Sequence, residues 1–245
     1  MSRITETVKH LIILNVIFYI GSQIVGPPAY ELFALYFPKN EHFHFWQLVS
    51  HMFMHDSQSI MHILFNMLGL WMFGSPLEQI LGRNRFLFFY FSAGIGAALI
   101  HTLVNYYQFN DAYQSVLEAG YSDDKIIEFL NARIESKSIT DYTLRSMYEV
   151  YNGYAVGASG ALYGILVAFG MMFPNTSLFL MFIPIPIKAK YFIPGLILMD
   201  LYSGFSGSSI FGSGIAHFAH IGGALFGFLM MWYWKNNSFN DKRWY

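Results

Sequence analysis

The sequence predicts an all-α polytopic membrane protein, with six transmembrane helices and an enlarged extramembrane loop between the third and the fourth. Of its 245 residues, 55% are hydrophobic and only 12% are charged, which is typical of a chain whose exterior faces lipid. A spanning helix needs roughly 20 apolar residues. Six segments approach that length, and we treat 1–245 as one transmembrane domain that contains them: 9–27, 61–81, 85–107, 157–173, 191–206 and 216–235.

The composition also excludes several classes of function. The net charge is −1 and no block of basic residues is present, so we expect the chain to contact the lipid bilayer and no nucleic acid. The chain has no cysteine, which rules out disulfides, thiolate nucleophiles and cysteine metal sites. Its nine histidines therefore carry more weight as candidates for chemistry.

The connecting segments differ from one another. Residues 28–60 are rich in aromatic residues and histidine, which indicates an interfacial loop. Residues 174–190 carry three prolines, and 206–214 are almost entirely glycine and serine, which favours a flexible loop able to act as a gate. The alternative interpretation is that 206–214 simply connect two helices.

Basic residues predict the orientation. If six helices alternate, both termini and most of the basic residues fall on one side, which the positive-inside rule makes cytoplasmic. The opposite side then receives the loop 108–152, in which acidic residues outnumber basic ones. The residues that define the basic side are Arg3, Lys9, Arg83, Arg85, Lys188, Lys190, Lys235, Lys242 and Arg243.

The insertion 108–152 contains one segment with a helical pattern. Ser122 stands where it could cap a helix, and apolar residues follow at helical spacing with polar residues between them. A small extramembrane subdomain and a flexible tether both fit this segment. The apolar positions are Ile126, Ile127, Leu130 and Ile134.

Gly157-Ala158-Ser159-Gly160 opens the fourth predicted span. A helix from there to Phe173 covers about 25 Å, less than the roughly 30 Å hydrocarbon core, so Ser159 is expected below the outer surface. A helix that begins inside the membrane needs a water-filled cavity for its first N–H groups. Taken alone, this motif is a weak signal and favours a small-residue packing site over a catalytic one.

The sixth span strengthens the case for catalysis. Gly223 and Gly227 are four residues apart and form a smooth helical face beside His220, as Gly160 and Gly164 do beside Ser159. If these faces pack, His220 and Ser159 lie at the same end of the contact. A neutral imidazole near a hydroxyl activates that weak nucleophile.

His62 and Asn66 share one face of the second span, because they are four residues apart. Both can donate hydrogen bonds to an oxyanion. A structural hydrogen bond between helices explains the pair equally well.

Together these motifs resemble the rhomboid intramembrane proteases, in the family's order and over nearly all of 46–234. The motifs are His62-x-x-x-Asn66, Gly157-x-Ser159-Gly160 and Ala219-His220-x-x-Gly223-x-x-x-Gly227.

The resemblance implies a six-helix rhomboid-like bundle and a serine endopeptidase without a cofactor, acting on transmembrane protein substrates. It implies a dyad of Ser159 and His220 without an essential acid, and an oxyanion hole made by His62, Asn66 and the Ser159 N–H. Tyr163 matches the aromatic residue that packs against the catalytic imidazole. Gln47 stands where bacterial relatives usually carry arginine. The resemblance therefore does not say whether this position braces the first loop here as that arginine does.

Other histidines leave a metal site to consider. His217 lies one turn before His220, and His51 and His55 form another pair four residues apart. No His-Glu-x-x-His is present. We therefore predict no metal, a supporting role for His217, and loop hydrogen bonds for His51 and His55.

Two rival functions stay open: a catalytically silent binder of membrane proteins, and a transporter that uses intramembrane histidines. The intact Ser159 and His220 favour the protease. We expect a bacterial inner membrane, cytoplasmic termini and an active site open to the outer side.

Overall fold

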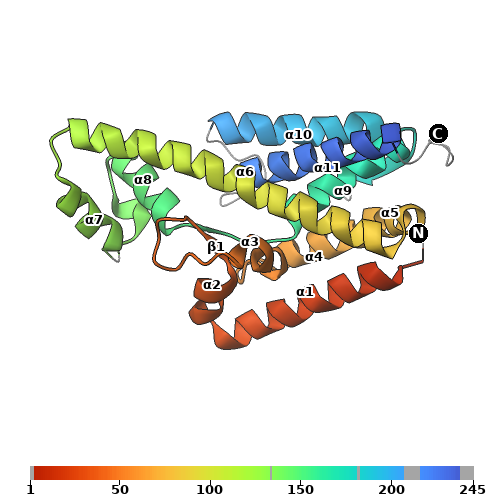
Figure 1. The fold of residues 1–245 in the computed structure, drawn as a ribbon, viewed down its shortest axis with the longest axis horizontal. Coiled ribbons are helices and arrows are strands. Elements are labelled where there is room, and N and C mark those ends of the chain that lie inside the picture. The colour runs from red at the N-terminus through yellow and green to blue at the C-terminus, as the bar shows by residue number, and fades with distance from the viewer. Residues whose placement is uncertain (1–2, 133, 181–182, 207–215, 238–245) are drawn as a thin grey trace.

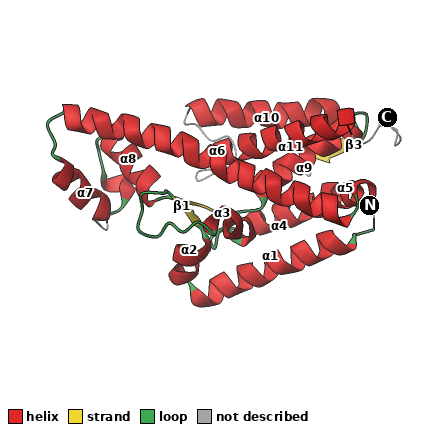
Figure 2. Cartoon of the chain, viewed as in Figure 1, coloured by secondary structure: helices red, strands yellow, loops and turns green. Residues whose placement is uncertain are grey.

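The computed structural model describes residues 3–132, 134–180, 183–206 and 216–237, and these form a mainly helical bundle (Figures 1 and 2). The first helices are α1 (Glu6–Val25), α2 (Pro27–Phe33), α3 (Gln47–Ser50), α4 (Ile60–Gly69) and α5 (Ser75–Leu81). The others are α6 (Arg83–Glu118), α7 (Asp123–Asn131), α8 (Tyr142–Asn152), α9 (Ser159–Met172), α10 (Ala189–Ser206) and α11 (His217–Asn237). Residues 207–214 of the predicted gating loop lie outside the described residues.

Each of the six predicted spans corresponds to a helical segment. The second comprises α4, a π-helical turn over Leu70–Gly74, and α5. Among the residues that the structure describes, three segments are long and apolar enough to cross a membrane: Glu6–Val25, Ile60–Leu81 and Arg83–Glu118. α9 is a shorter apolar helix. The chain therefore has several apolar helices of membrane length.

The prediction of an all-α fold was wrong in detail, because two short antiparallel sheets are present. β1 (Leu35–Tyr36) pairs with β2 (Tyr154–Ala155), and β3 (Ser177–Leu180) pairs with β4 (Ile183–Lys188). β4 carries prolines, which lack an N–H and are tolerated on a strand that pairs along one edge. The β1–β2 pair joins the first loop to the segment that leads into α9.

The centre of the bundle is formed by α6, α9 and α11, which pack directly on one another (Figure 1). α10 lies along the outer side of α9 and α11, while α4 lies between α1 and this centre. The start of α1, the start of α6 and the end of α11 lie at one end of the molecule.

The N-terminus of α1 is fastened to α5 by Glu78. This buried carboxylate accepts hydrogen bonds from the backbone N–H groups of Thr7 (3.1 Å) and Val8 (3.0 Å) and from the Thr5 hydroxyl. These N–H groups belong to a helix start, where no intrahelical acceptor exists and a negative charge is favourable. Glu78 thereby fixes α1 against the bundle.

The insertion 108–152 folds on the far end of α6, which continues well beyond the predicted end at 107. α7 and α8 pack against this extension (Figure 1). Ser122 occupies the N-cap position of α7 without a side-chain cap bond, whereas Asp141 caps α8 by accepting from the Leu144 N–H at 2.9 Å. We call this unit, 108–152, the α7–α8 subdomain. Its apolar cluster comprises Phe37, Phe109, Ala112, Val116, Ile126, Leu130 and Met147.

The first loop is held by Gln47, which is fully buried. Its side-chain oxygen accepts from the N–H groups of Tyr36 (3.3 Å) and His44 (3.1 Å). Its amide donates to the carbonyls of Glu31 (3.0 Å) and His42 (2.7 Å). Gln47 thus connects separate parts of the loop through four backbone groups.

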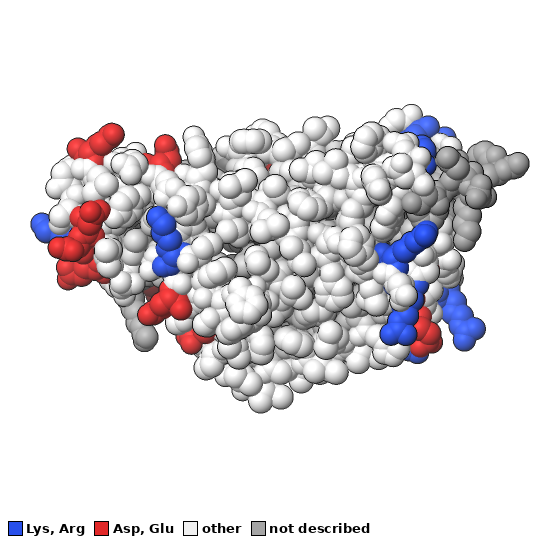
Figure 3. Space-filling view, in the orientation of Figure 1, with Lys and Arg blue, Asp and Glu red and all other residues white. Residues whose placement is uncertain are grey.

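Charged side chains gather at the two ends of the molecule (Figure 3). The face shown has a broad middle region almost free of charge, with mainly acidic groups beyond it at the α7–α8 end and mostly basic groups at the other end. Such an uncharged band is what a hydrocarbon core requires.

Candidate active site

Ser159 is the first residue of α9 and follows a constrained turn. Gly157 has φ of 122°, a conformation that residues with a Cβ rarely adopt. A Cβ on Gly157 would also come within 2.8 Å of His62 Nε2. The Gly157 N–H donates to the His51 carbonyl at 2.9 Å, which fastens the turn to the first loop. Ser159 therefore lies at a helix N-terminus, where backbone N–H groups have no intrahelical acceptor.

The structure brings Ser159 and His220 together. His220 lies in the first turn of α11, and its Nε2 is 2.8 Å from Ser159 Oγ. Tyr163, one turn after Ser159, stacks on the imidazole with ring centroids 4.2 Å apart and planes within 10°. The imidazole is thus held face-on by Tyr163 while its edge meets the hydroxyl.

The four-spaced glycines make this approach possible. A Cβ on Gly223 would lie 1.8 Å from the Gly160 carbonyl oxygen, and one on Gly227 would lie 2.5 Å from Gly164 Cα. The backbones of α9 and α11 therefore touch. Gly157 belongs to the motif for which the sequence left a small-residue packing role open, but it precedes α9 and adjoins His62 rather than α11.

A small face of α6 completes this contact, which the sequence reasoning had not included. A Cβ on Gly160 would meet Ala97 Cβ at 2.5 Å, and one on Gly222 would meet Ala97 Cα at 3.1 Å. Three helices thus converge where Ser159 and His220 meet.

His62 faces the same turn from α4. The Asp56 N–H donates to His62 Nδ1 at 3.2 Å, so in a neutral ring the proton is on Nε2, the atom beside Gly157. Asn66 is buried and donates one amide N–H to the His62 carbonyl at 2.8 Å. Its second amide N–H is the group that an oxyanion would use. His62 thus presents a donor toward the turn that bears Ser159.

Asp200 of α10 is a site residue that the sequence reasoning missed. It is 5% exposed, and its Oδ1 lies 3.1 Å from His220 Nδ1 and 2.6 Å from His217 Nδ1. The Tyr163 hydroxyl donates to Oδ2. A signal was available, because an acidic residue inside an apolar span is rare and typically functional. His217 and His220 therefore contact the same carboxylate oxygen.

The remaining predicted histidines make hydrogen bonds elsewhere. His51 Nδ1 donates to the Gln47 carbonyl at 2.7 Å, and His55 Nε2 lies 2.9 Å from the side-chain oxygen of Asn15 on α1. Both are buried.

One cluster in the described residues has the composition of a metal site. Asp200, His217 and His220 each offer one ligand atom, and these atoms lie within 4.8 Å of one another. A carboxylate and two imidazoles suit zinc. The hydrogen bonds among them show that the same atoms also satisfy one another without an ion.

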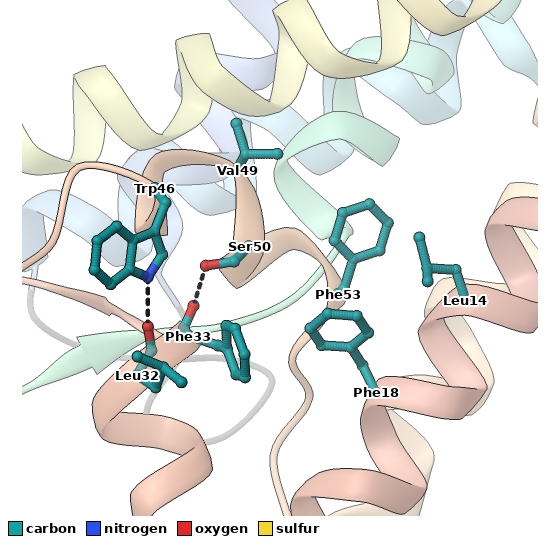
Figure 4. A pocket seen from close by; sticks show the side chains of 8 residues that line it. All are labelled: Leu14, Phe18, Leu32, Phe33, Trp46, Val49, Ser50 and Phe53. Carbon is teal, nitrogen blue, oxygen red and sulfur yellow. Dashed lines mark hydrogen bonds between the residues drawn. The ribbon is translucent and has the colours of Figure 1, made fainter.

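Two hollows in the structure differ in volume and in the polarity of their walls. A narrow cavity of about 20 Å³ lies beside Ser159 and is lined by residues that include His51, His101 and Gly157. A wider hollow of about 550 Å³ lies between α1, α2 and α3, and its walls are almost wholly apolar (Figure 4). Figure 4 shows that the two polar groups in its wall, the Trp46 indole N–H and the Ser50 hydroxyl, donate to backbone carbonyls. In a membrane chain, such a surface is suited to lipid.

The chain is similar in sequence to proteins of one known family. The family model described as the rhomboid domain matches residues 42–237. The chain is 26% identical over 176 residues to "Rhomboid protein 1, mitochondrial" of Saccharomyces cerevisiae, which covers 72% of this chain and 38% of the relative. It is 28% identical over 193 residues to "Presenilin-associated rhomboid-like protein, mitochondrial" of Homo sapiens, covering 76% of this chain and 39% of the relative.

A bacterial relative is similar at the same level. "Rhomboid protease AarA" of Providencia stuartii is 29% identical over 195 residues, which covers 76% of this chain and 54% of the relative. The matched segment thus spans between about two fifths and about half of these relatives. The family model, in contrast, matches most of this chain, including the Ser159 turn, α9 and α11. The chain therefore belongs to the rhomboid family and is an integral membrane protein.

Proposed function

We propose that this protein is an intramembrane serine endopeptidase that cleaves transmembrane or juxtamembrane segments of other membrane proteins. The observation that carries the proposal is the 2.8 Å contact between Ser159 Oγ and His220 Nε2. In the reaction, His220 Nε2 accepts the proton of Ser159 as Oγ attacks the scissile carbonyl carbon. The imidazolium then gives that proton to the leaving amine, and water hydrolyses the acyl-enzyme.

The charge that develops on the carbonyl oxygen needs preorganised donors. His62 Nε2, the second amide N–H of Asn66 and the Ser159 N–H serve this role in our proposal. Support comes from the hydrogen bond that the Asp56 N–H makes to His62 Nδ1, which leaves the Nε2 proton beside the Ser159 turn.

We also propose the placement in the membrane. The six helical segments of the sequence analysis each span it, with the basic end and both termini on the cytoplasmic side. α9 has 14 residues, about 21 Å at 1.5 Å per residue, so Ser159 lies below the opposite surface and opens to it. The assignment to a bacterial inner membrane stays a prediction, because the relatives come from both bacteria and mitochondria.

The two rivals differ from the protease in testable ways. A silent binder would leave Ser159 unreactive, and a transporter would use Asp200, His217 and His220 as ligands for an ion. Supporting the protease, a partly buried histidine whose two nitrogens contact a hydroxyl and a carboxylate is the arrangement of a general base.

The test is cleavage of a single-span membrane protein by the full chain purified in detergent. Ser159→Ala and His220→Ala should each lower kcat by at least about 10³-fold. Ser22→Ala, at another buried serine on α1, and His10→Ala, at an exposed histidine, are the matched controls and should stay within about twofold.

A fluorophosphonate probe gives an independent readout, because it labels an activated serine. Mass spectrometry should locate the label on Ser159 in the wild type and find none in His220→Ala. Cleavage that survives Ser159→Ala would overturn the proposal, and cleavage abolished by a chelator would favour metal chemistry instead.

A further inference from the structure

Asp200 is a carboxylate held inside the bundle by groups from two other helices. Placing a charge in the interior of a membrane protein is costly unless it is paired. Here α9 supplies the Tyr163 hydroxyl, while α11 supplies the Nδ1 atoms of His217 and His220. Three donors converging on one buried side chain are typical of an ionised carboxylate in a fixed orientation.

The contact with His220 determines which ring nitrogen carries the proton. Because Asp200 Oδ1 accepts from His220 Nδ1, the neutral ring has its proton on Nδ1 and a lone pair on Nε2. That lone pair lies 2.8 Å from Ser159 Oγ. The opposite tautomer would point an N–H at the hydroxyl and could not accept its proton.

We propose that Asp200 is a positioning residue that completes a relay of Ser159, His220 and Asp200, in place of the dyad without an acid that the sequence analysis expected. The inference rests on the proposed protease function. When Ser159 gives its proton to His220 Nε2, the imidazolium forms beside the Asp200 carboxylate. Asp200 itself keeps its charge and takes up no proton.

His217 and Tyr163 have a definite part in this arrangement. His217 donates to the same Oδ1 as His220, and Tyr163 donates to Oδ2, so the carboxylate cannot rotate without losing one of these bonds. Tyr163 also stacks on His220, so a single side chain fixes both the imidazole and its carboxylate. The orientation of His220 is thereby set from its face and from its Nδ1 edge.

A metal ion is the competing explanation for the same three side chains. An ion on His220 Nδ1 would replace the N–H that Asp200 accepts. The Nδ1-to-Oδ1 separations of 2.6 and 3.1 Å are hydrogen-bond lengths, which favours the relay. The two explanations differ in their response to chelator and to added zinc.

The experiment compares Asp200→Asn with the wild type in the full chain. An amide keeps the size of the carboxylate but has no charge to stabilise the imidazolium, and it can turn its NH2 toward His220 Nδ1 and so favour the wrong tautomer. We expect kcat to fall by about 10²–10⁴-fold while KM stays within about threefold. Tyr202→Phe, at an exposed position of the same helix, is the matched control and should leave both parameters unchanged.

A spectroscopic readout separates this proposal from the proposed function. ¹⁵N NMR of labelled histidine, with the His220 signal assigned by its loss in His220→Gln, should show the proton on Nδ1 in the wild type. In Asp200→Asn the signal should change to the other tautomer or to a mixture. This measurement does not require a substrate or activity.

The outcomes decide between the possibilities. The relay would be overturned if the wild type is active, Asp200→Asn has a kcat within threefold of it, and the His220 signal is the same in both. The proposed protease function would then still stand. An inactive wild type whose His220 still has its proton on Nδ1 would contradict the proposed function alone. A His220 signal that shifts when chelator is added would overturn the relay in favour of a metal. If Asp200→Asn strongly lowers the thermal midpoint, Asp200→Glu and Asp200→Ala are compared instead. Because glutamate keeps the carboxylate, Asp200→Glu should have a higher kcat than Asp200→Ala. Equal kcat values in these two variants would contradict the proposal.

Discussion

The contact between α9 and α11 and the α7–α8 subdomain are held together in opposite ways. In the contact, glycines bring two backbones together, and buried polar groups lie in the space at its end. In the subdomain, larger apolar side chains fill a small core, as in a water-soluble domain. The first region gains little from a hydrophobic effect, because lipid is as apolar as the protein interior. The second depends on it.

This difference determines which kind of substitution destabilises each region. The helix contact depends on the absence of side chains, so the smallest addition is harmful. The subdomain depends on the presence of side chains, so removal of one is harmful. The polar site lies at the end of the first kind of region, where two helix backbones are in contact.

The largest effect on the reactivity of Ser159 is expected from adding a Cβ in the helix contact. Gly223→Ala would place that atom 1.8 Å from the Gly160 carbonyl oxygen, so α9 and α11 must move apart. We expect destabilisation of at least the ~1–3 kcal/mol of an overpacked core. Because a 1 Å misplacement of reacting groups costs about 10²-fold, fluorophosphonate labelling of Ser159 should slow at least that much.

The matched control is Gly21→Ala on α1, where no atom lies within 4 Å of the added Cβ. Its thermal midpoint should be equal to the wild type or slightly higher, because alanine favours a helix over glycine by roughly 0.5–1 kcal/mol. If Ser159 in Gly223→Ala were labelled at the wild-type rate, the active site would not require backbone contact between α9 and α11.

Truncation inside the subdomain should have a large but local effect. Ile126 is 1% exposed, and Ile126→Ala should cost the α7–α8 core about 2–5 kcal/mol. Hydrogen exchange of α7 and α8 should accelerate while exchange of α9 and α11 stays unchanged. Ser159 labelling should remain within about twofold.

Ile127 provides the control, because it is the next residue and is 53% exposed. Ile127→Ala should change stability by less than about 0.5 kcal/mol. If Ile126→Ala slowed Ser159 labelling as strongly as Gly223→Ala, the two regions would not be independent.

The same contrast explains how much of the molecule could be predicted from sequence. The small faces of Gly160 with Gly164 and of Gly223 with Gly227 follow from spacing along single helices, so the approach of Ser159 to His220 could be anticipated. Asp200 could have been singled out as an acidic residue in an apolar span, but its contact with His220 could not be predicted, because it comes from a third helix and spacing gives no rotational register between helices. The continuation of α6 beyond residue 107 was not predicted because the sequence becomes more polar there. The apolar residues of this part of α6 are buried only when the α7–α8 subdomain is folded.

The smallest effect is expected in the first loop, which contacts both regions. Gln47→Ala removes four hydrogen bonds to backbone groups of the loop. Water can replace part of them near the interface, so we expect a local cost of about 1–3 kcal/mol. Hydrogen exchange at Tyr36 and His44 should accelerate, whereas Gln58→Ala, at an exposed glutamine, should leave it unchanged.

Gln47→Arg shows whether the amide itself is required. Gln47 both donates and accepts, whereas a guanidinium has donors only, so arginine could bond the carbonyls of Glu31 and His42 but not the N–H groups of Tyr36 and His44. We expect faster exchange at those two amides in Gln47→Arg, as in Gln47→Ala. Wild-type protection in Gln47→Arg would mean that charge or size at this position holds the loop. Loss of protection would mean that the loop is held by the pairing of each backbone group with this particular side chain.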